Sequence, residues 1–262
     1  MRAYRIKGDV FYTPIRRYAR GEQTVISIAS VHVGRQEYWD DIQGEINKIK
    51  FGLYEGISRE PPSQNTNPKI DNLSGTLDDI SDFAAICLGG IFQNNALNYP
   101  TSWESPDLSM DDVANSVDKN MMEKAEKARW AIDHIRRLHE TYPKEVEAII
   151  GRGFIFLSRF GLLDKLFSLE SGKVYRDVLE KRRDAILIES ANSKLNANLE
   201  ELGIIYGAAH MRCLDKHLRY DGFRLEDERW LAALDLSDRL PFWKSLFSLA
   251  RSIKRDGQQI TN

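Results

Sequence analysis

Short apolar runs near both ends of the chain are separated by helical patterns. Residues 24–28, 51–54 and 204–206 are rich in β-branched and aromatic side chains, which is typical of strands. Between the first two runs, apolar side chains recur every three or four positions, at Tyr38, Trp39, Ile42, Ile46 and Ile49. This spacing predicts a helix over 35–50 with one buried face. The two flanking strands are expected to be parallel and adjacent in the sheet.

The third run begins a second unit of the same kind. After Gly207, Ala208 and Ala209, helical spacing continues through Met211, Leu214 and Leu218 as far as a break at 221–222. Residues 223–225 then look like a strand, as do residues 10–13 near the start of the chain. Both units therefore consist of a strand, a turn of small residues and a helix.

The middle of the chain is different in character. Residues 59–68 combine proline with asparagine and serine, which predicts a loop, and an apolar stretch over 78–95 predicts a buried helix broken at Gly89 and Gly90. Residues 110–198 are helix-rich and are interrupted at Pro143. We therefore expect an α/β fold with a mixed, largely parallel central sheet flanked by helices. Residues 1–236 would form a single domain, with a helical insertion over about 110–198.

The last segment, residues 237–262, is predicted to be an amphipathic helix and tail. Over 240–255 it mixes bulky apolar side chains with Lys244, Arg251, Lys254 and Arg255. A basic amphipathic helix of this kind is found at membrane surfaces, whereas most amphipathic helices of globular chains pack on their own core. Both interpretations stay open at the level of sequence.

Composition narrows the possible partners and the compartment. The 37 Lys and Arg residues nearly balance the 39 Asp and Glu residues, for a net charge of −2, so the electrostatics do not favour nucleic acid as a partner. Cys87 and Cys213 are too few for a disulfide framework. The sequence contains no apolar run of the roughly 18 to 20 residues that span a bilayer. We expect a soluble cytoplasmic protein of unknown oligomeric state.

Three side chains that carry chemistry follow the predicted strands. His32 and His210 come after the first and third strands, and Glu55 directly after the second. The carboxyl ends of parallel strands meet at one edge of a sheet, so His32 and Glu55 should lie close enough to share a ligand or a proton. The small residues from Gly207 onward would let backbone N–H groups approach a bound anion closely.

These motifs, taken in order, resemble the TraB/GumN/TIKI family, which is grouped with erythromycin-esterase-like and ChaN-like proteins. The matching segments are 29–32 (Ala-Ser-Val-His), 53–56 (Leu-Tyr-Glu-Gly), 183–184 (Arg-Asp) and 207–211, which contains the Gly-x-x-His motif. Residues 93–109 also look like a segment of that family, and the resemblance spans residues 24 to about 232. Ala29 stands where the family has glycine, and alanine does not easily adopt a positive φ.

The resemblance implies a metal-assisted hydrolase of peptide or ester bonds. In this interpretation His32, Glu55, Arg183 and His210 are catalytic, and His32, Glu55 and His210 bind the metal. Two imidazoles and a carboxylate suit Mn²⁺, Co²⁺ or Zn²⁺ and leave a position for water. Tyr99, Trp103, Asp107 and Gly207 would bind substrate, although loop aromatics also commonly anchor a loop to the core.

Three alternatives remain open. A metal-free hydrolase would use His32 or His210 as general base, with Glu55 orienting it and Arg183 holding negative charge. A non-catalytic regulatory or binding protein could keep the fold and contact a membrane surface through residues 240–255. A haem or iron carrier like the ChaN relatives is the third, and the sequence offers no distinct ligand set for it.

Overall fold

The computed structural model describes residues 2–56, 81–109, 119–160 and 180–259, together with residues 79, 112 and 115. The loop expected over 59–68 lies outside the described residues, as do parts of the helical insertion around 113–118 and 161–179.

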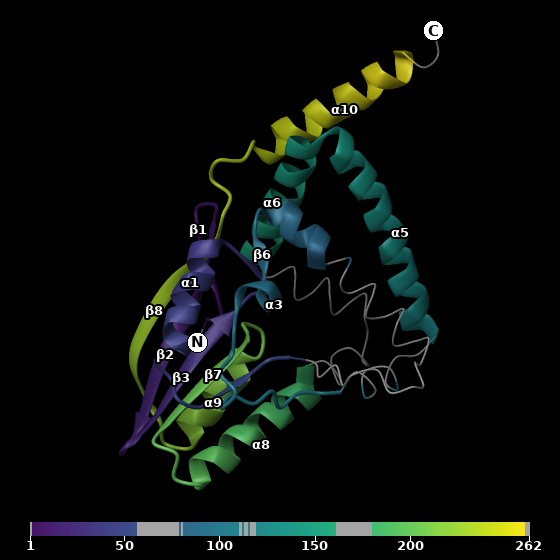
Figure 1. Cartoon of the computed structure of the whole chain (residues 1–262). Coiled ribbons are helices and arrows are strands. Elements are labelled where there is room, and N and C mark those ends of the chain that lie inside the picture. Colours follow the sequence, from purple (N-terminus) through teal and green to yellow (C-terminus); the bar gives the residue numbers. More distant parts are fainter. Residues whose placement is uncertain are drawn as a thin grey trace.

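The described residues form a mixed sheet with helices on both faces, which confirms the predicted α/β class (Figure 1). Its six strands are β1 (Arg5–Lys7), β2 (Val10–Arg20), β3 (Gln23–Ser30), β5 (Gly52–Tyr54), β7 (Glu201–Gly207) and β8 (Arg224–Asp235). Strands β3, β7 and β5 are parallel, whereas β2 pairs antiparallel with β1, β3 and β8. A second, two-stranded sheet joins β4 (Val33–Gly34) to β6 (Ile91–Phe92).

Strand β7 lies between β3 and β5, so the expectation that the first two predicted strands are neighbours is wrong. In the register, Gly203 of β7 is paired with Ile26 on one side and with Gly52 on the other. The central position therefore belongs to a strand that follows β5 by about 150 residues in sequence. As a result, the residues after β7 reach the site from between the ends of β3 and β5.

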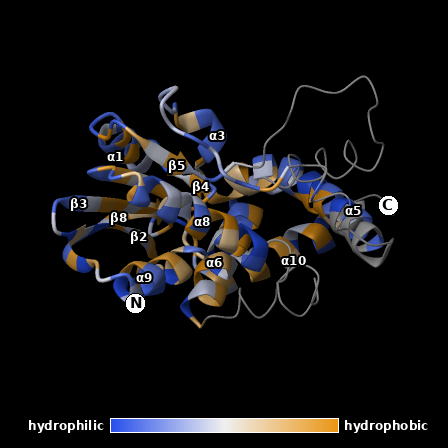
Figure 2. Ribbon diagram, turned by 90° about the horizontal axis from the view of Figure 1, so that it is seen from below, coloured by the Kyte–Doolittle hydropathy of each residue, from blue (hydrophilic) through white to orange (hydrophobic). Residues whose placement is uncertain are grey.

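Helices cover both faces of the parallel strands (Figure 2). Helix α1 (Gln36–Ile46) packs on one face, and all five apolar residues predicted for its buried side are at most 3% exposed. Helices α8 (Arg183–Asn196) and α9 (Met211–Tyr220) pack on the other face, where Met211, Leu214 and Leu218 are buried as predicted. Burying apolar stripes on both faces is the usual reason why parallel strands are covered by helices.

The alternation of side chains along β5 decides where Glu55 points. Leu53 packs among the residues that α8 and α9 cover, whereas Gly52 faces the other side of the sheet. Successive side chains of a strand point to opposite faces, so Glu55 shares the face of Leu53. The carboxylate is therefore directed toward α8 and α9 rather than toward α1.

The remaining helices extend away from the sheet. Residues 81–88 are helical and end at Gly89, as the sequence predicts, and the short α3 (Gln93–Ala96) follows β6. Helix α5 (Lys119–Thr141) precedes α6 (Pro143–Arg159), which begins at the expected proline. The C-terminal α10 (Phe242–Gln259) lies against α6. No helix among the described residues is both long enough and apolar enough to cross a bilayer.

The side chain of Trp103 covers part of the parallel strands, on the face of the sheet where α1 packs. Its indole lies over Gly52 and Gly203, the two glycines that pair across β5 and β7. A Cβ added at Gly52 would come within 2.5 Å of three ring atoms. The ring is 5% exposed and its N–H donates to the carbonyl of Ile49 at 3.3 Å.

This contact predicts that Gly52→Ala destabilises the protein. The added methyl group would overlap the indole ring, and overpacking of this kind costs about 1–3 kcal/mol in the free energy of unfolding. Gly44→Ala on α1 is the matched control, because an added Cβ there meets nothing within 4 Å, and alanine in a helix is favoured by about 1 kcal/mol. Urea unfolding of both variants checks the difference. Equal stability of Gly52→Ala and wild type would show that the indole is not held over this glycine.

Candidate active site

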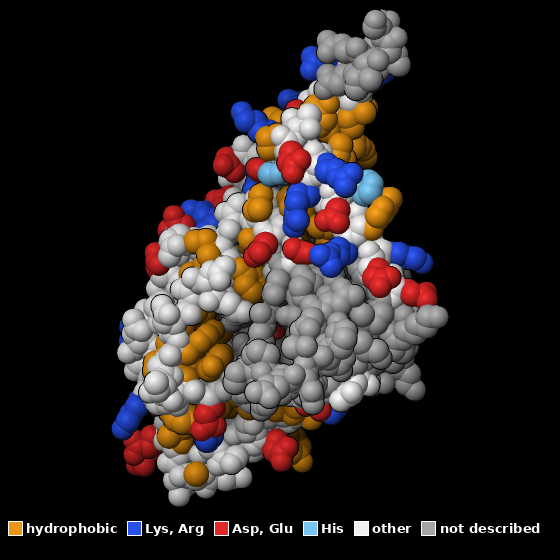
Figure 3. Space-filling view, turned by 45° about the vertical axis from the view of Figure 1, so that its right-hand side comes forward, with side chains coloured by type: hydrophobic (Ala, Val, Ile, Leu, Met, Phe, Trp, Pro, Cys, Tyr) orange, Lys and Arg blue, Asp and Glu red, His pale blue; other side chains and the backbone are white. Residues whose placement is uncertain are grey.

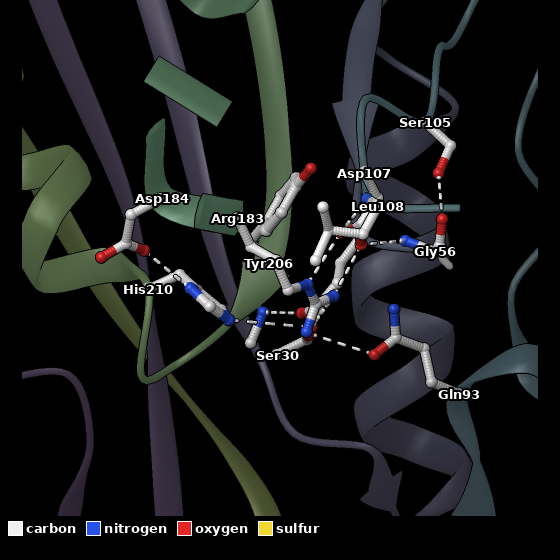
Figure 4. Close-up of polar contacts among 12 residues, drawn as sticks. Ser30, Gly56, Gln93, Ser105, Asp107, Leu108, Arg183, Asp184, Tyr206 and His210 are labelled. Carbon is white, nitrogen blue, oxygen red and sulfur yellow. Dashed lines mark hydrogen bonds and ion pairs between the residues drawn. The ribbon is translucent and has the colours of Figure 1, made fainter. Parts of the chain in front are cut away.

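The candidate site lies at the carboxyl ends of β3, β7 and β5 (Figure 4). Glu55 follows β5 directly, and its backbone N–H donates to the carbonyl of Ile205 at 2.9 Å, which continues the pairing with β7. The side chain is 5% exposed. Strand pairing therefore holds the backbone at Glu55, and the carboxylate is buried at the sheet edge.

Both oxygens of the Glu55 carboxylate have a donor. Arg183 donates from Nη2 to Oε1 at 2.7 Å, and the backbone N–H of Gly207 donates to Oε2. A Cβ at Gly207 would lie 2.9 Å from Oε2, so the absence of a side chain lets the carboxylate come close to the backbone. The anion at this turn of small residues is thus the protein's own Glu55. The sequence predicted that Gly207 contacts substrate, whereas in the structure its backbone N–H contacts Glu55.

Arg183 joins Glu55 to a second buried carboxylate. It donates to Asp107 through Nε at 2.7 Å and through Nη2 at 2.6 Å, a two-pronged geometry that suits a guanidinium and a carboxylate. The Asp107 side chain is fully buried and also accepts the backbone N–H groups of Gly56 and Leu108. Arg183 is therefore held between two anions, with its side chain 11% exposed.

The neighbouring residue, Asp184, binds the second histidine. Its Oδ1 lies 2.7 Å from Nδ1 of His210, whose side chain is 7% exposed. Nε2 of the same ring lies 3.9 Å from Oε1 of Glu55. The Arg-Asp pair at the start of α8 therefore contacts both strand ends, with Arg183 on Glu55 and Asp184 on His210 (Figure 4).

Electrostatics keep Glu55 ionised. Burial raises the pKa of its carboxyl group, but its interactions with His32, Arg183 and His210 lower it. The hydrogen bond from the N–H of Gly207 acts in the same direction, and the net effect is a pKa below the ordinary value. Glu55 is thus a buried carboxylate that stays charged because of its partners.

His32 lies on the exposed side of this cluster. Its side chain is exposed and its ring lies 6.0 Å from that of Phe92, while its carbonyl accepts the N–H of Gln93 at 2.8 Å. It is close enough to lower the pKa of Glu55. Arg183 and His210 therefore lie beside the Glu55 carboxylate, and His32 is near enough to act on its charge. Ala29 needs no positive φ, because it lies inside β3 and pairs with Tyr206.

The three loop residues expected to bind substrate lie in different places. Tyr99 is half-buried near Glu55, stacks on Tyr54 with the ring centroids 3.9 Å apart, and accepts a hydrogen bond from Gln93 at 3.1 Å. Trp103 belongs to the core over the glycines of β5 and β7. Asp107 is the buried partner of Arg183. Of the three, Tyr99 alone is positioned to meet a molecule bound beside Glu55.

Some site residues were not identified as functional from the sequence. Asp184 belongs to the Arg-Asp motif but had no assigned role, and its adjacency to Arg183 was the signal that could have shown it. Ser30 and Gln93 are buried and hydrogen bonded to each other at 3.1 Å, and Gln93 donates to Tyr99. Gln93 is brought there by α3, far from β3 in sequence, so no local pattern indicated it.

The residues expected to bind a metal already have partners within the protein. Both Glu55 oxygens already accept hydrogen bonds, and the Arg183 guanidinium occupies the position of a cation beside Oε1. In the described part of the chain, no three His, Cys, Asp or Glu side chains are grouped as metal ligands. Cys213 does not supply a thiolate, because burial and the neighbouring Asp184 raise the pKa of its thiol.

The lowered pKa of Glu55 predicts a loss of stability in acid. An unfolded Glu has a pKa near 4.5, and the folded value is lower. The stabilisation is therefore complete above pH 4.5 and is lost as the pH falls through the folded pKa. Glu55→Gln should lower the free energy of unfolding by about 3–5 kcal/mol at pH 7, because Arg183 loses a buried partner. Between pH 5 and pH 3, the stability of Glu55→Gln should also decrease less than that of the wild-type protein.

Glu104→Gln is the matched control for that variant. Glu104 pairs with Lys194 at 2.7 Å, but its side chain is 53% exposed, and an exposed pair contributes about 0.5 kcal/mol. Urea unfolding from pH 7 to pH 3 compares the two variants. Equal effects of both substitutions would contradict a special role for the buried carboxylate.

The chain was also compared with known proteins. No family model matches it, and the searches of curated proteins and of solved structures likewise give no match. The geometry of the site and the motifs of the sequence are therefore what a functional proposal can use.

Proposed function

We propose that the protein is a hydrolase of peptide or ester bonds that uses His210 as a general base without a metal ion. The observation that carries the proposal is that two carboxylates lie at opposite nitrogens of one buried imidazole, that of His210. Asp184 lies 2.7 Å from Nδ1, and Glu55 lies 3.9 Å from Nε2. Asp184 would hold the ring with its proton on Nδ1, which leaves the lone pair of Nε2 directed toward the site.

In the proposed reaction a water molecule would be held by both acceptors. With hydrogen bonds of about 2.8 Å, one water can donate to Nε2 of His210 and to Oε1 of Glu55 across such a gap. His210 would take one proton as the water oxygen attacks the carbonyl carbon of the substrate. The same proton would then pass to the departing amine or alcohol as the tetrahedral intermediate collapses.

Arg183 would stabilise the negative charge that develops on the substrate oxygen. Its hydrogen bonds to Glu55 and Asp107 use Nε and Nη2. The N–H groups of Nη1, for which the described part of the chain shows no acceptor, would donate to this oxygen. A donor fixed by two buried carboxylates needs little reorganisation during the reaction, which is the property of an effective oxyanion site.

The state of the cysteines supports catalysis by histidine rather than by cysteine. It also supports a cytoplasmic location. Both Cys87 and Cys213 are free. Burial raises the pKa of the Cys87 thiol to about 11, so it is not a thiolate at neutral pH. Free thiols are ordinary in a reducing compartment, and we therefore propose the cytoplasm as the location.

The proposal predicts the effect of substitutions in the dyad. A panel of chromogenic esters and peptides should reveal hydrolysis by the wild-type protein. His210→Ala and Asp184→Asn should each lower kcat by about a hundredfold or more, because the general base is lost or its tautomer changes. His217→Ala is the control, since His217 is on α9, the helix that follows His210, but bonds Asn192 and Asp221. Full activity in His210→Ala would refute the proposal.

The absence of a metal from the proposed reaction predicts resistance to chelators. Activity measured after dialysis against EDTA should equal that of the untreated enzyme, because the proton transfers use side chains alone. Elemental analysis of the same samples provides the comparison. Loss of activity on chelation and its recovery with Zn²⁺, Mn²⁺ or Co²⁺ would instead favour the metal-assisted form of the hydrolase.

A further inference from the structure

Helix α10 packs against the protein through a face that is rich in serine. Ser245 is fully buried, and Ser248 donates to Glu145 of α6 at 2.9 Å. Ser245, Ser248 and Ser252 are spaced by three and four residues, so they share one side of the helix. The inward side of α10 thus consists of these serines together with the half-buried Phe242 and Leu249, and the larger apolar stripe is not on it.

The apolar stripe of the same helix faces solvent. Trp243 is 66% exposed, Phe247 61%, Ile253 45% and Leu246 38%. These residues also recur at helical spacing and form a single face distinct from the serine face. Residues 240–255 contain four Lys and Arg residues and no Asp or Glu, and the side chains of Lys244 and Arg251 are exposed beside the apolar stripe.

The position of the helix leaves this face accessible. Helix α10 lies at one end of the molecule and runs past the start of α6 (Figure 1). The space-filling view shows hydrophobic side chains beside basic ones at that end (Figure 3). A flat surface could therefore contact the stripe along the helix without meeting the sheet.

We propose that this face of α10 binds the surface of a membrane that contains anionic phospholipid. The aromatic and aliphatic side chains would enter the interface between headgroups and acyl chains, and Lys244 and Arg251 would contact the headgroup phosphates and carboxylates. Charge decides between this partner and a second copy of the chain. Self-association would bring two helices of the same positive sign together, whereas an anionic bilayer complements them.

Vesicle co-sedimentation of the full chain tests this proposal. Vesicles of phosphatidylcholine with phosphatidylserine should bind the protein about tenfold or more tightly than vesicles of phosphatidylcholine alone, and high salt should weaken the binding. The double variant Trp243→Glu, Phe247→Glu should lose binding to both. Lys244→Glu together with Arg251→Glu should remove the preference for phosphatidylserine. Circular dichroism verifies folding, which exposed positions should preserve.

Tyr220→Glu is the matched control, because Tyr220 is an aromatic residue of α9 that is 90% exposed. It should bind vesicles like the wild type. Failure of the wild-type protein to bind phosphatidylserine vesicles would overturn the proposal. Sedimentation velocity without lipid gives the other contrary outcome, a dimer that Trp243→Glu dissociates, which would make this face a contact between copies. Both results are independent of the hydrolase assays.

Discussion

A carboxylate buried at a sheet edge needs positive partners, and the organisation of the site follows from that requirement. Glu55 is fixed by strand pairing on the side of the sheet that α8 and α9 cover. An isolated buried carboxylate would take up a proton. Arg183, the N–H of Gly207 and the nearby histidines prevent this, and they tie the start of α8 and the end of β7 to the end of β5.

The same interaction links stability to the proposed chemistry. Arg183 is fixed because two buried carboxylates hold it, and His210 is fixed because the adjacent Asp184 holds its ring. Helix α8 is therefore the element that orders both groups. In the proposed reaction Arg183 is the oxyanion donor, and His210, which Asp184 holds, is the proton acceptor. Both depend on the first two residues of α8, so a displacement of this helix would disturb both.

The C-terminal helix shows a different relation between pattern and packing. Its sequence is compatible with docking on the domain by the apolar face or with exposure of that face. In the structure the helix is docked through a face rich in serine, and Trp243 and Phe247 remain exposed. The periodicity of the sequence shows that the helix has an apolar and a polar face. It does not show which of the two packs against the rest of the protein.

The sequence by itself determined the elements whose patterns are local. The buried face of α1, the helix after His210 and the strand positions followed from spacing, because these depend on neighbours within a few residues. The convergence of His32, Glu55 and His210 at one edge followed from the rule that parallel strands end together. The length of β8 was underestimated, since its charged residues 226–229 lie on an edge strand where solvent accepts them. Tertiary structure alone decided that β7 separates β3 from β5, that Arg183 and Gly207 satisfy Glu55, and that Asp107 and Trp103 are buried. Those outcomes depend on contacts between residues up to about 150 positions apart, and no periodicity along the chain encodes such pairings.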